Sequence, residues 1–187
     1  MTTSSFGPSA LATPANVVSV GRLVVSPLLL LAIVEGSDSW LALMLWIGLC
    51  VTDGLDGYLA RRQGTTRSGA FLDPLADKVL VLGAMGALVA ADRFCWVPVA
   101  VIAAREVVIS AFRSYWVRQG LAVPATGWAK VKTVVQETAV GFALLPVTAD
   151  ERWPANTLLW AAVVLTVGTG VHYLYCGSRS TRTTGFA

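Results

Sequence analysis

Six long apolar stretches run through almost the whole of this 187-residue chain, and they constrain its fold more than any other feature. They are Val17–Val34, Trp40–Ala60, Pro74–Ala91, Trp96–Tyr115, Val131–Val147 and Leu158–Tyr175. Each is close to the roughly 20 residues that an α-helix needs to cross a bilayer. Only 13% of the residues are charged, against roughly 25% in soluble domains. The sequence therefore predicts an all-α integral membrane protein with six transmembrane helices.

The chain outside these stretches is short, so we expect one six-helix domain over residues 16–177. Residues 1–15 contain no Lys or Arg, whereas a secretory signal needs a positive segment ahead of its apolar core. We interpret residues 1–15 as a flexible tail rather than a cleaved signal, and residues 178–187 as a second, cytoplasmic tail.

The basic residues are divided unequally between the two sides of the predicted bundle. With the N-terminus inside, the outer segments Glu35–Ser39, Ala91–Phe94 and Ala149–Pro154 hold only Arg93 and Arg152. The inner side holds nine cations: Arg61, Arg62, Arg67, Arg113, Arg118, Lys130, Lys132, Arg179 and Arg182. Lys and Arg favour the cytoplasmic side of a membrane, so both termini are predicted to face the cytoplasm. Some of these cations are alternatively explained by contact with anionic lipids.

Four aspartates interrupt this apolar pattern at the predicted cytoplasmic ends of the second and third stretches. Asp53 and Asp56 are spaced i, i+3, and Asp73 and Asp77 are spaced i, i+4, so each pair lies on one face of its helix. A short basic loop joins the two helices, which are therefore antiparallel and carry the four carboxylates at similar depth. The two pairs are predicted to converge.

Four carboxylates near a bilayer core repel one another, and burying them is costly. Divalent cations with oxygen ligands offset that charge, and two metal ions about 4 Å apart suit phosphoryl chemistry. Small residues at Gly57, Ala60 and Gly69 let a ligand approach the backbone, and Arg61 offers a fork for phosphate oxygens. The alternative interpretation is that the aspartates only cap helices or pair with neighbouring cations, Arg61 and Lys78.

The motif Asp53-x2-Asp56-Gly57-x2-Ala60-Arg61-x7-Gly69-x3-Asp73-x3-Asp77 resembles the signature of the CDP-alcohol phosphatidyltransferases. The resemblance implies the six-helix fold of that family, a homodimer, and Mg²⁺ or Mn²⁺ as cofactor, with two ions expected. It implies that Asp53, Asp56, Asp73 and Asp77 ligate metal and that Asp77 is also the general base. Binding of the CDP moiety is assigned by the same resemblance to Asp56, Gly57, Ala60, Arg61, Gly69 and Asn16. The implied reaction is attack of an alcohol on the β-phosphorus of CDP-diacylglycerol, with CMP leaving.

Three weaker elements concern the acceptor alcohol. Asn16-x2-Ser19-x2-Arg22, Arg105-Glu106 and Ala129-Lys130-Val131-Lys132-Thr133 resemble motifs of the branch that uses glycerol 3-phosphate. Ser19 and Ala129 depart from the usual Thr and Gly of those motifs. An anionic acceptor would explain four further cations, so the acceptor phosphate is predicted to bind Arg105, Arg113, Lys130 and Lys132. Alternatively, Arg105 is occupied by Glu106 or an aspartate, and the two lysines only mark the membrane interface.

Other functions remain open. Inositol phosphate and phosphatidylglycerol, the acceptor in cardiolipin synthesis, are also anionic. A metal or cation transporter would place acidic residues at several depths, whereas here they cluster, and a phosphohydrolase would use the same metals on water. The expected partners are the two substrates and membrane lipid of a bacterial-type cell membrane, with no nucleic acid.

Overall fold

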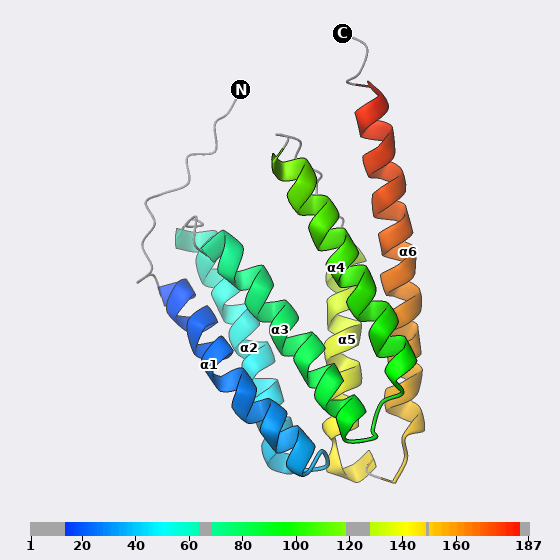
Figure 1. The fold of residues 1–187 in the computed structure, drawn as a ribbon. Coiled ribbons are helices and arrows are strands. Elements are labelled where there is room, and N and C mark those ends of the chain that lie inside the picture. The colour runs from blue at the N-terminus through cyan, green and yellow to red at the C-terminus, as the bar shows by residue number, and fades with distance from the viewer. Residues whose placement is uncertain (1–13, 64–68, 119–127, 149, 184–187) are drawn as a thin grey trace. The chain divides into compact units, whose positions relative to one another are not determined.

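The computed structural model describes residues 14–63, 69–118, 128–148 and 150–183, and every regular element in these ranges is helical (Figure 1). The elements are α1 (Pro14–Glu35), α2 (Trp40–Gln63), α3 (Gly69–Ala90), α4 (Trp96–Arg118), α5 (Trp128–Leu144), the 3-10 turn η1 (Pro146–Thr148) and α6 (Trp153–Thr183). The prediction of an all-α protein is confirmed. Most of the tail predicted for residues 1–15 lies outside the described residues, as do residues 184–187 at the other end.

The end of α5 differs from the predicted apolar stretch Val131–Val147. The helix begins at Trp128 and ends at Leu144, three residues before the apolar stretch does. Pro146 lacks a backbone N–H and disfavours helical geometry in the residue before it, so α5 cannot continue. The chain turns instead through η1, in which the Thr148 amide donates to the carbonyl of Leu145 at 3.0 Å.

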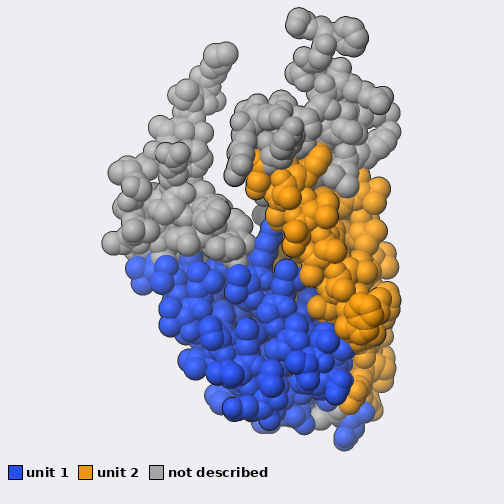
Figure 2. Space-filling view, in the orientation of Figure 1, with its two compact units in different colours: residues 1–94, 140–150 blue, residues 95–139, 151–187 orange. Residues whose placement is uncertain are grey.

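The chain forms two compact units (Figure 2). Unit 1 comprises Met1–Phe94 and Val140–Asp150, and unit 2 comprises Cys95–Ala139 and Glu151–Ala187. In unit 1, α1 packs against both α2 and α3, and in unit 2, α4 packs against α6. Apolar side chains fill the interior of each unit. They include Leu29, Ile33, Met85 and Leu88 in unit 1 and Ile102, Leu159 and Ala162 in unit 2.

The C-terminus of α3 is closed by a hydrogen-bonded turn at Asp92. This residue has a φ of 55°, a left-handed conformation that Asp tolerates better than most residues. The amide of Asp92 donates to the carbonyl of Val89 at 3.1 Å, and that of Arg93 donates to Leu88 at 2.8 Å. This pair of bonds is a Schellman motif, and it ends α3 without unsatisfied carbonyls at these positions.

Much of the surface of both units is apolar. Val24, Leu28 and Leu31 are exposed on α1, as are Val107 on α4 and Val164 on α6. Two described segments, Val17–Glu35 and Trp153–Val171, are long and apolar enough to cross a membrane, and the protein buries only 28% and 33% of an 18-residue stretch within each. Extensive exposed apolar surface indicates contact with lipid or with another apolar partner. The number of membrane crossings stays a prediction.

Candidate active site

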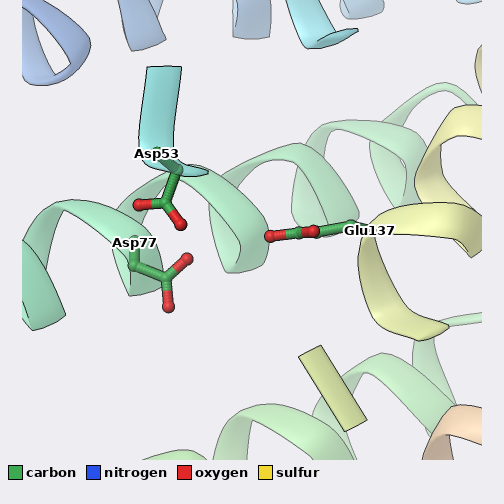
Figure 3. A group of neighbouring side chains, drawn as sticks. All are labelled: Asp53, Asp77 and Glu137. Atoms are coloured by element: carbon green, nitrogen blue, oxygen red, sulfur yellow. The ribbon is translucent and has the colours of Figure 1, made fainter. Parts of the chain in front are cut away.

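The aspartate motif occupies two helices of unit 1. Asp53 and Asp56 lie on α2, Asp73 and Asp77 lie on α3, and both helices pack against α1. Of the four carboxylates, the described ones are those of Asp53 and Asp77. A carboxylate oxygen of Asp53 lies within 4.8 Å of one from Asp77, and Figure 3 shows the two side chains on their separate helices. The fold therefore brings together one acid from each half of the motif.

The Asp53 carboxylate has a cationic partner on α1. Its Oδ1 accepts a hydrogen bond from Nη1 of Arg22, and the two side chains form an ion pair. The Arg22 side chain is fully buried, whereas that of Asp53 is 36% exposed. A buried cation requires a partner, and Asp53 supplies it while keeping part of its carboxylate accessible. The same helix carries two further buried polar side chains, Ser19 and Ser26, at three residues before and four after Arg22.

These oxygens fit a hard divalent cation. Carboxylates are the ligands that Mg²⁺ and Mn²⁺ prefer, and two of them from different helices meet here. The partial exposure of the Asp53 side chain keeps its carboxylate accessible to such an ion. Glu137, also drawn in Figure 3, belongs to the part of α5 in unit 2.

Several predicted site residues are described only through their backbone. Asn16 lies on α1, Gly57, Ala60 and Arg61 on α2, and Gly69 on α3. Arg113 lies on α4 and Lys130 on α5. The side chains of these residues, like those of Asp56 and Asp73, lie outside the described part of the structure. Their predicted roles therefore stay predictions.

In unit 2, two of the residues predicted to bind the acceptor phosphate, Arg105 and Lys132, both contact Glu106. Glu106 Oε1 accepts a hydrogen bond from Arg105 Nη1 at 3.0 Å and another from Lys132 Nζ. Arg105 is also bound to α6, where its Nε donates to the carbonyl of Thr166 at 3.0 Å. The interpretation that Glu106 engages Arg105 thus describes a contact that is present.

Sequence reasoning did not assign a site role to Arg22, although a signal for one existed. Arg22 is the only charged residue in the apolar stretch Val17–Val34. An ionisable residue within such a stretch almost always pairs with another inside the protein. The signal indicated that a counter-ion exists, but several acids of the chain could have supplied it. The structure identifies it as Asp53.

Comparison with known proteins identifies a family with which most of the chain aligns. The family described as CDP-alcohol phosphatidyltransferase matches residues 12–168. This range includes Asp53 and Asp77 and the three residues Arg105, Glu106 and Lys132.

Individual proteins of three bacteria are also similar to the chain. "Probable phosphatidylglycerophosphate synthase" of Mycobacterium tuberculosis (strain H37Rv) is 37% identical over 175 residues, covering 90% of this chain and 83% of the relative. "CDP-diacylglycerol--glycerol-3-phosphate 3-phosphatidyltransferase" of Haemophilus influenzae is 35% identical over 164 residues, covering 83% and 88%. The protein of the same name from Escherichia coli K12 is 39% identical over 138 residues, covering 71% and 76%.

Proposed function

Because the chain belongs to the CDP-alcohol phosphatidyltransferase family, we propose that it transfers the phosphatidyl group of CDP-diacylglycerol to glycerol 3-phosphate. The products are phosphatidylglycerophosphate and CMP, so the enzyme acts in phospholipid biosynthesis. The observation that carries the proposal is the meeting of Asp53 and Asp77 from two helices of unit 1, which supplies oxygen ligands beside each other. The names of relatives in three bacteria support glycerol 3-phosphate as the acceptor.

In the proposed site, Asp53, Asp56, Asp73 and Asp77 hold Mg²⁺ or Mn²⁺, with two ions expected. When bound, the metal neutralises the pyrophosphate charge and stabilises the charge that develops in the transition state. The CDP moiety lies along Gly57, Ala60 and Gly69, where side chains are small, with Arg61, Asp56 and Asn16 as polar contacts. Arg22 keeps Asp53 in place from the side of α1.

The chemical step needs a base for the acceptor hydroxyl. Asp77 takes the hydroxyl proton as the oxygen attacks the β-phosphorus of CDP-diacylglycerol. A new P–O bond forms to the acceptor, and the P–O bond to CMP breaks with its electron pair leaving on CMP. The acceptor's own phosphate is bound by basic residues of α4 and α5, namely Arg113, Lys130 and Lys132. Arg105 lies on the same helix as Arg113.

We further propose that the protein is a multi-pass, six-span homodimer in a bacterial-type cell membrane, with the active site and both termini in the cytoplasm. The asymmetric distribution of Lys and Arg supports this orientation. A cytoplasmic site gives the water-soluble glycerol 3-phosphate direct access.

The test is release of CMP by the purified full-length protein in detergent with Mg²⁺ and CDP-diacylglycerol. We expect release only when glycerol 3-phosphate is added, and not with inositol phosphate, serine or phosphatidylglycerol in its place. Stimulation by one of those three alone would replace the proposed acceptor. Release without any acceptor would indicate a phosphohydrolase, and no release under any condition would favour a transporter.

A further inference from the structure

A buried ionic network in unit 2 joins α4, α5 and α6. The exposed fraction is 8% for Glu106, 6% for Lys132 and 3% for Gln136. We infer that Arg105 and Glu106 are positioning residues for Lys132. Arg105 is bound to α6, Glu106 links Arg105 to Lys132, and together they set the affinity of Lys132 for the acceptor phosphate. This inference rests on the proposed function, in which Lys132 binds that phosphate.

Arg105 uses all three of its side-chain nitrogens within the protein. Nε donates to the Thr166 carbonyl at 3.0 Å, and Nη2 donates to Thr169 Oγ1 at 3.1 Å. Nη1 donates to Glu106 at 3.0 Å. A guanidinium has five N–H groups in a fixed planar fork, so these three bonds determine its plane and direction. Arg105 therefore acts as a clamp between α4 and α6 rather than as a ligand for an incoming anion.

Helix α6 leaves room for this arginine at Gly170. A Cβ at this position would lie 3.1 Å from Arg105 Nε and 3.3 Å from its Cγ. Arg105 would therefore have to shift by a few tenths of an ångström to admit a side chain at residue 170, and its Nε is the atom that donates to the Thr166 carbonyl. Gly168, on the same helix, has no described atom within 4 Å of the corresponding position. Of these two glycines, Gly170 is the one at which an added Cβ would meet Arg105.

Glu106 connects Arg105 of α4 to Lys132 of α5. Its Oε1 is the acceptor for both Arg105 and Lys132, so one oxygen fixes the two cations relative to each other. Four residues after Lys132 on α5, Gln136 Nε2 donates to Thr166 Oγ1 at 3.0 Å. Helix α5 is consequently bound to α6 in two ways. Gln136 contacts Thr166 directly, and Lys132 is connected to α6 through Glu106 and Arg105 of α4. Lys132 is thus positioned by α6, a helix that carries none of the residues predicted to bind the acceptor phosphate.

The first test compares Gly170→Ala with Gly168→Ala in the CMP-release assay of the full-length protein. Both substitutions add one methyl group to the same helix, so helix propensity changes equally. We expect Gly170→Ala to raise the KM for glycerol 3-phosphate about fivefold, because a displaced Arg105 loosens a charged hydrogen-bond network. The KM for CDP-diacylglycerol and the kcat should stay within about twofold, and Gly168→Ala should match the wild type in all three.

The second test removes the Glu106 carboxylate, which accepts the hydrogen bonds of both Arg105 and Lys132. Glu106→Ala is expected to raise the KM for glycerol 3-phosphate by about tenfold or more. Glu106→Gln retains a side-chain oxygen that accepts hydrogen bonds, and it should recover most of that loss. A purely structural role would instead lower the thermal stability and the amount of active protein without changing this KM.

Equal KM values for Gly170→Ala and Gly168→Ala would overturn the inference, as would a KM that rises alike for both substrates in Glu106→Ala. If Glu106→Ala does not fold, the comparison of Gly170→Ala with Gly168→Ala tests the inference by itself. Failure of the wild type to release CMP with glycerol 3-phosphate would defeat the proposed function itself, before any variant is measured, and the inference would fall with it.

Discussion

At the scale of single residues, Arg22 shows how an ionised group is accommodated in an apolar helix. Its side chain is fully buried, and its guanidinium pairs with Asp53 of the aspartate motif. The backbone carbonyl of Arg22 also accepts a hydrogen bond from the Ser26 hydroxyl at 2.7 Å. The positive charge of Arg22 offsets part of the negative charge that the motif concentrates in unit 1. A divalent cation would supply charge of the same sign to the same carboxylate.

Replacing Arg22 by Gln should make the protein depend more strongly on metal. Loss of the buried half of the ion pair is expected to destabilise the metal-free protein by about 2 kcal/mol. Without the guanidinium, a cation approaches Asp53 against less repulsion. We therefore expect Mg²⁺ to raise the Tm of Arg22→Gln more than that of the wild type, measured by thermal unfolding in detergent. An equal or smaller shift would contradict this account of the pair.

Asp77 is the proposed general base and metal ligand, and its charge should be essential for turnover. Asp77→Asn keeps the shape but cannot take the hydroxyl proton, so the kcat for CMP release should fall by about 10²–10⁴-fold. Asp38→Asn is the matched control, because Asp38 is exposed in the segment between α1 and α2. The control should retain wild-type activity. Comparable activity in the two variants would remove Asp77 from the chemistry.

At the scale of helices, close packing of α1 against α3 holds unit 1 together. A Cβ at Gly83 would lie 3.3 Å from Cδ1 and 3.4 Å from Cδ2 of Leu30, so the glycine allows α3 to approach α1 closely. Small residues at helix contacts serve this purpose widely in membrane proteins. Gly86, one turn later on α3, has no described atom within 4 Å of a Cβ. The two glycines therefore have different consequences for packing.

Valine in place of these two glycines should separate packing from helix propensity. Gly83→Val forces its methyl groups against Leu30, and such overpacking costs about 1–3 kcal/mol. Gly86→Val places the same side chain on an exposed part of α3. We expect a lower Tm for Gly83→Val than for Gly86→Val in the same detergent. If both variants unfold at one temperature, the Leu30 contact does not limit the approach of the helices.

At the scale of the whole molecule, apolar surface and charge distribution together determine where the protein can reside. Exposed Val side chains occur on helices of both units, and unit 1 also has exposed Leu and Ile. Such a surface indicates contact with lipid or with another apolar partner. The proposed orientation places the segment Ala91–Phe94 outside the cell. Cys95 directly follows this segment and is exposed. It offers a native probe of orientation.

Cys95 should react with a membrane-impermeant maleimide from the outside. The experiment uses intact cells that express a variant with Cys50 and Cys176 replaced by Ala, and labelling is detected as a mass or gel shift. Further replacement of Cys95 by Ala should abolish the signal. Labelling only in inside-out vesicles would reverse the proposed topology and place both termini outside.

The helices and the family could be predicted from local patterns in the sequence. The apolar stretch Val17–Val34 becomes most of α1, because apolar residues favour a helix whose backbone groups are satisfied internally. The regular spacing of Asp53, Asp56, Asp73 and Asp77 defines the family motif without reference to any tertiary contact. Even the early end of α5 follows from Pro146, although hydropathy alone extended the stretch to Val147.

The contacts between helices were decided only by the tertiary structure. Arg22 pairs with Asp53, and Gly170 makes room for Arg105, across 31 and 65 residues of chain respectively (53 minus 22; 170 minus 105). Such contacts depend on how each helix is rotated about its axis and on its register against its neighbour, which side-chain packing sets. Apolar residues on all sides of a membrane helix leave that rotation unspecified. The sequence by itself therefore determined which residues are charged within the helices, and the packing determined which of them meet.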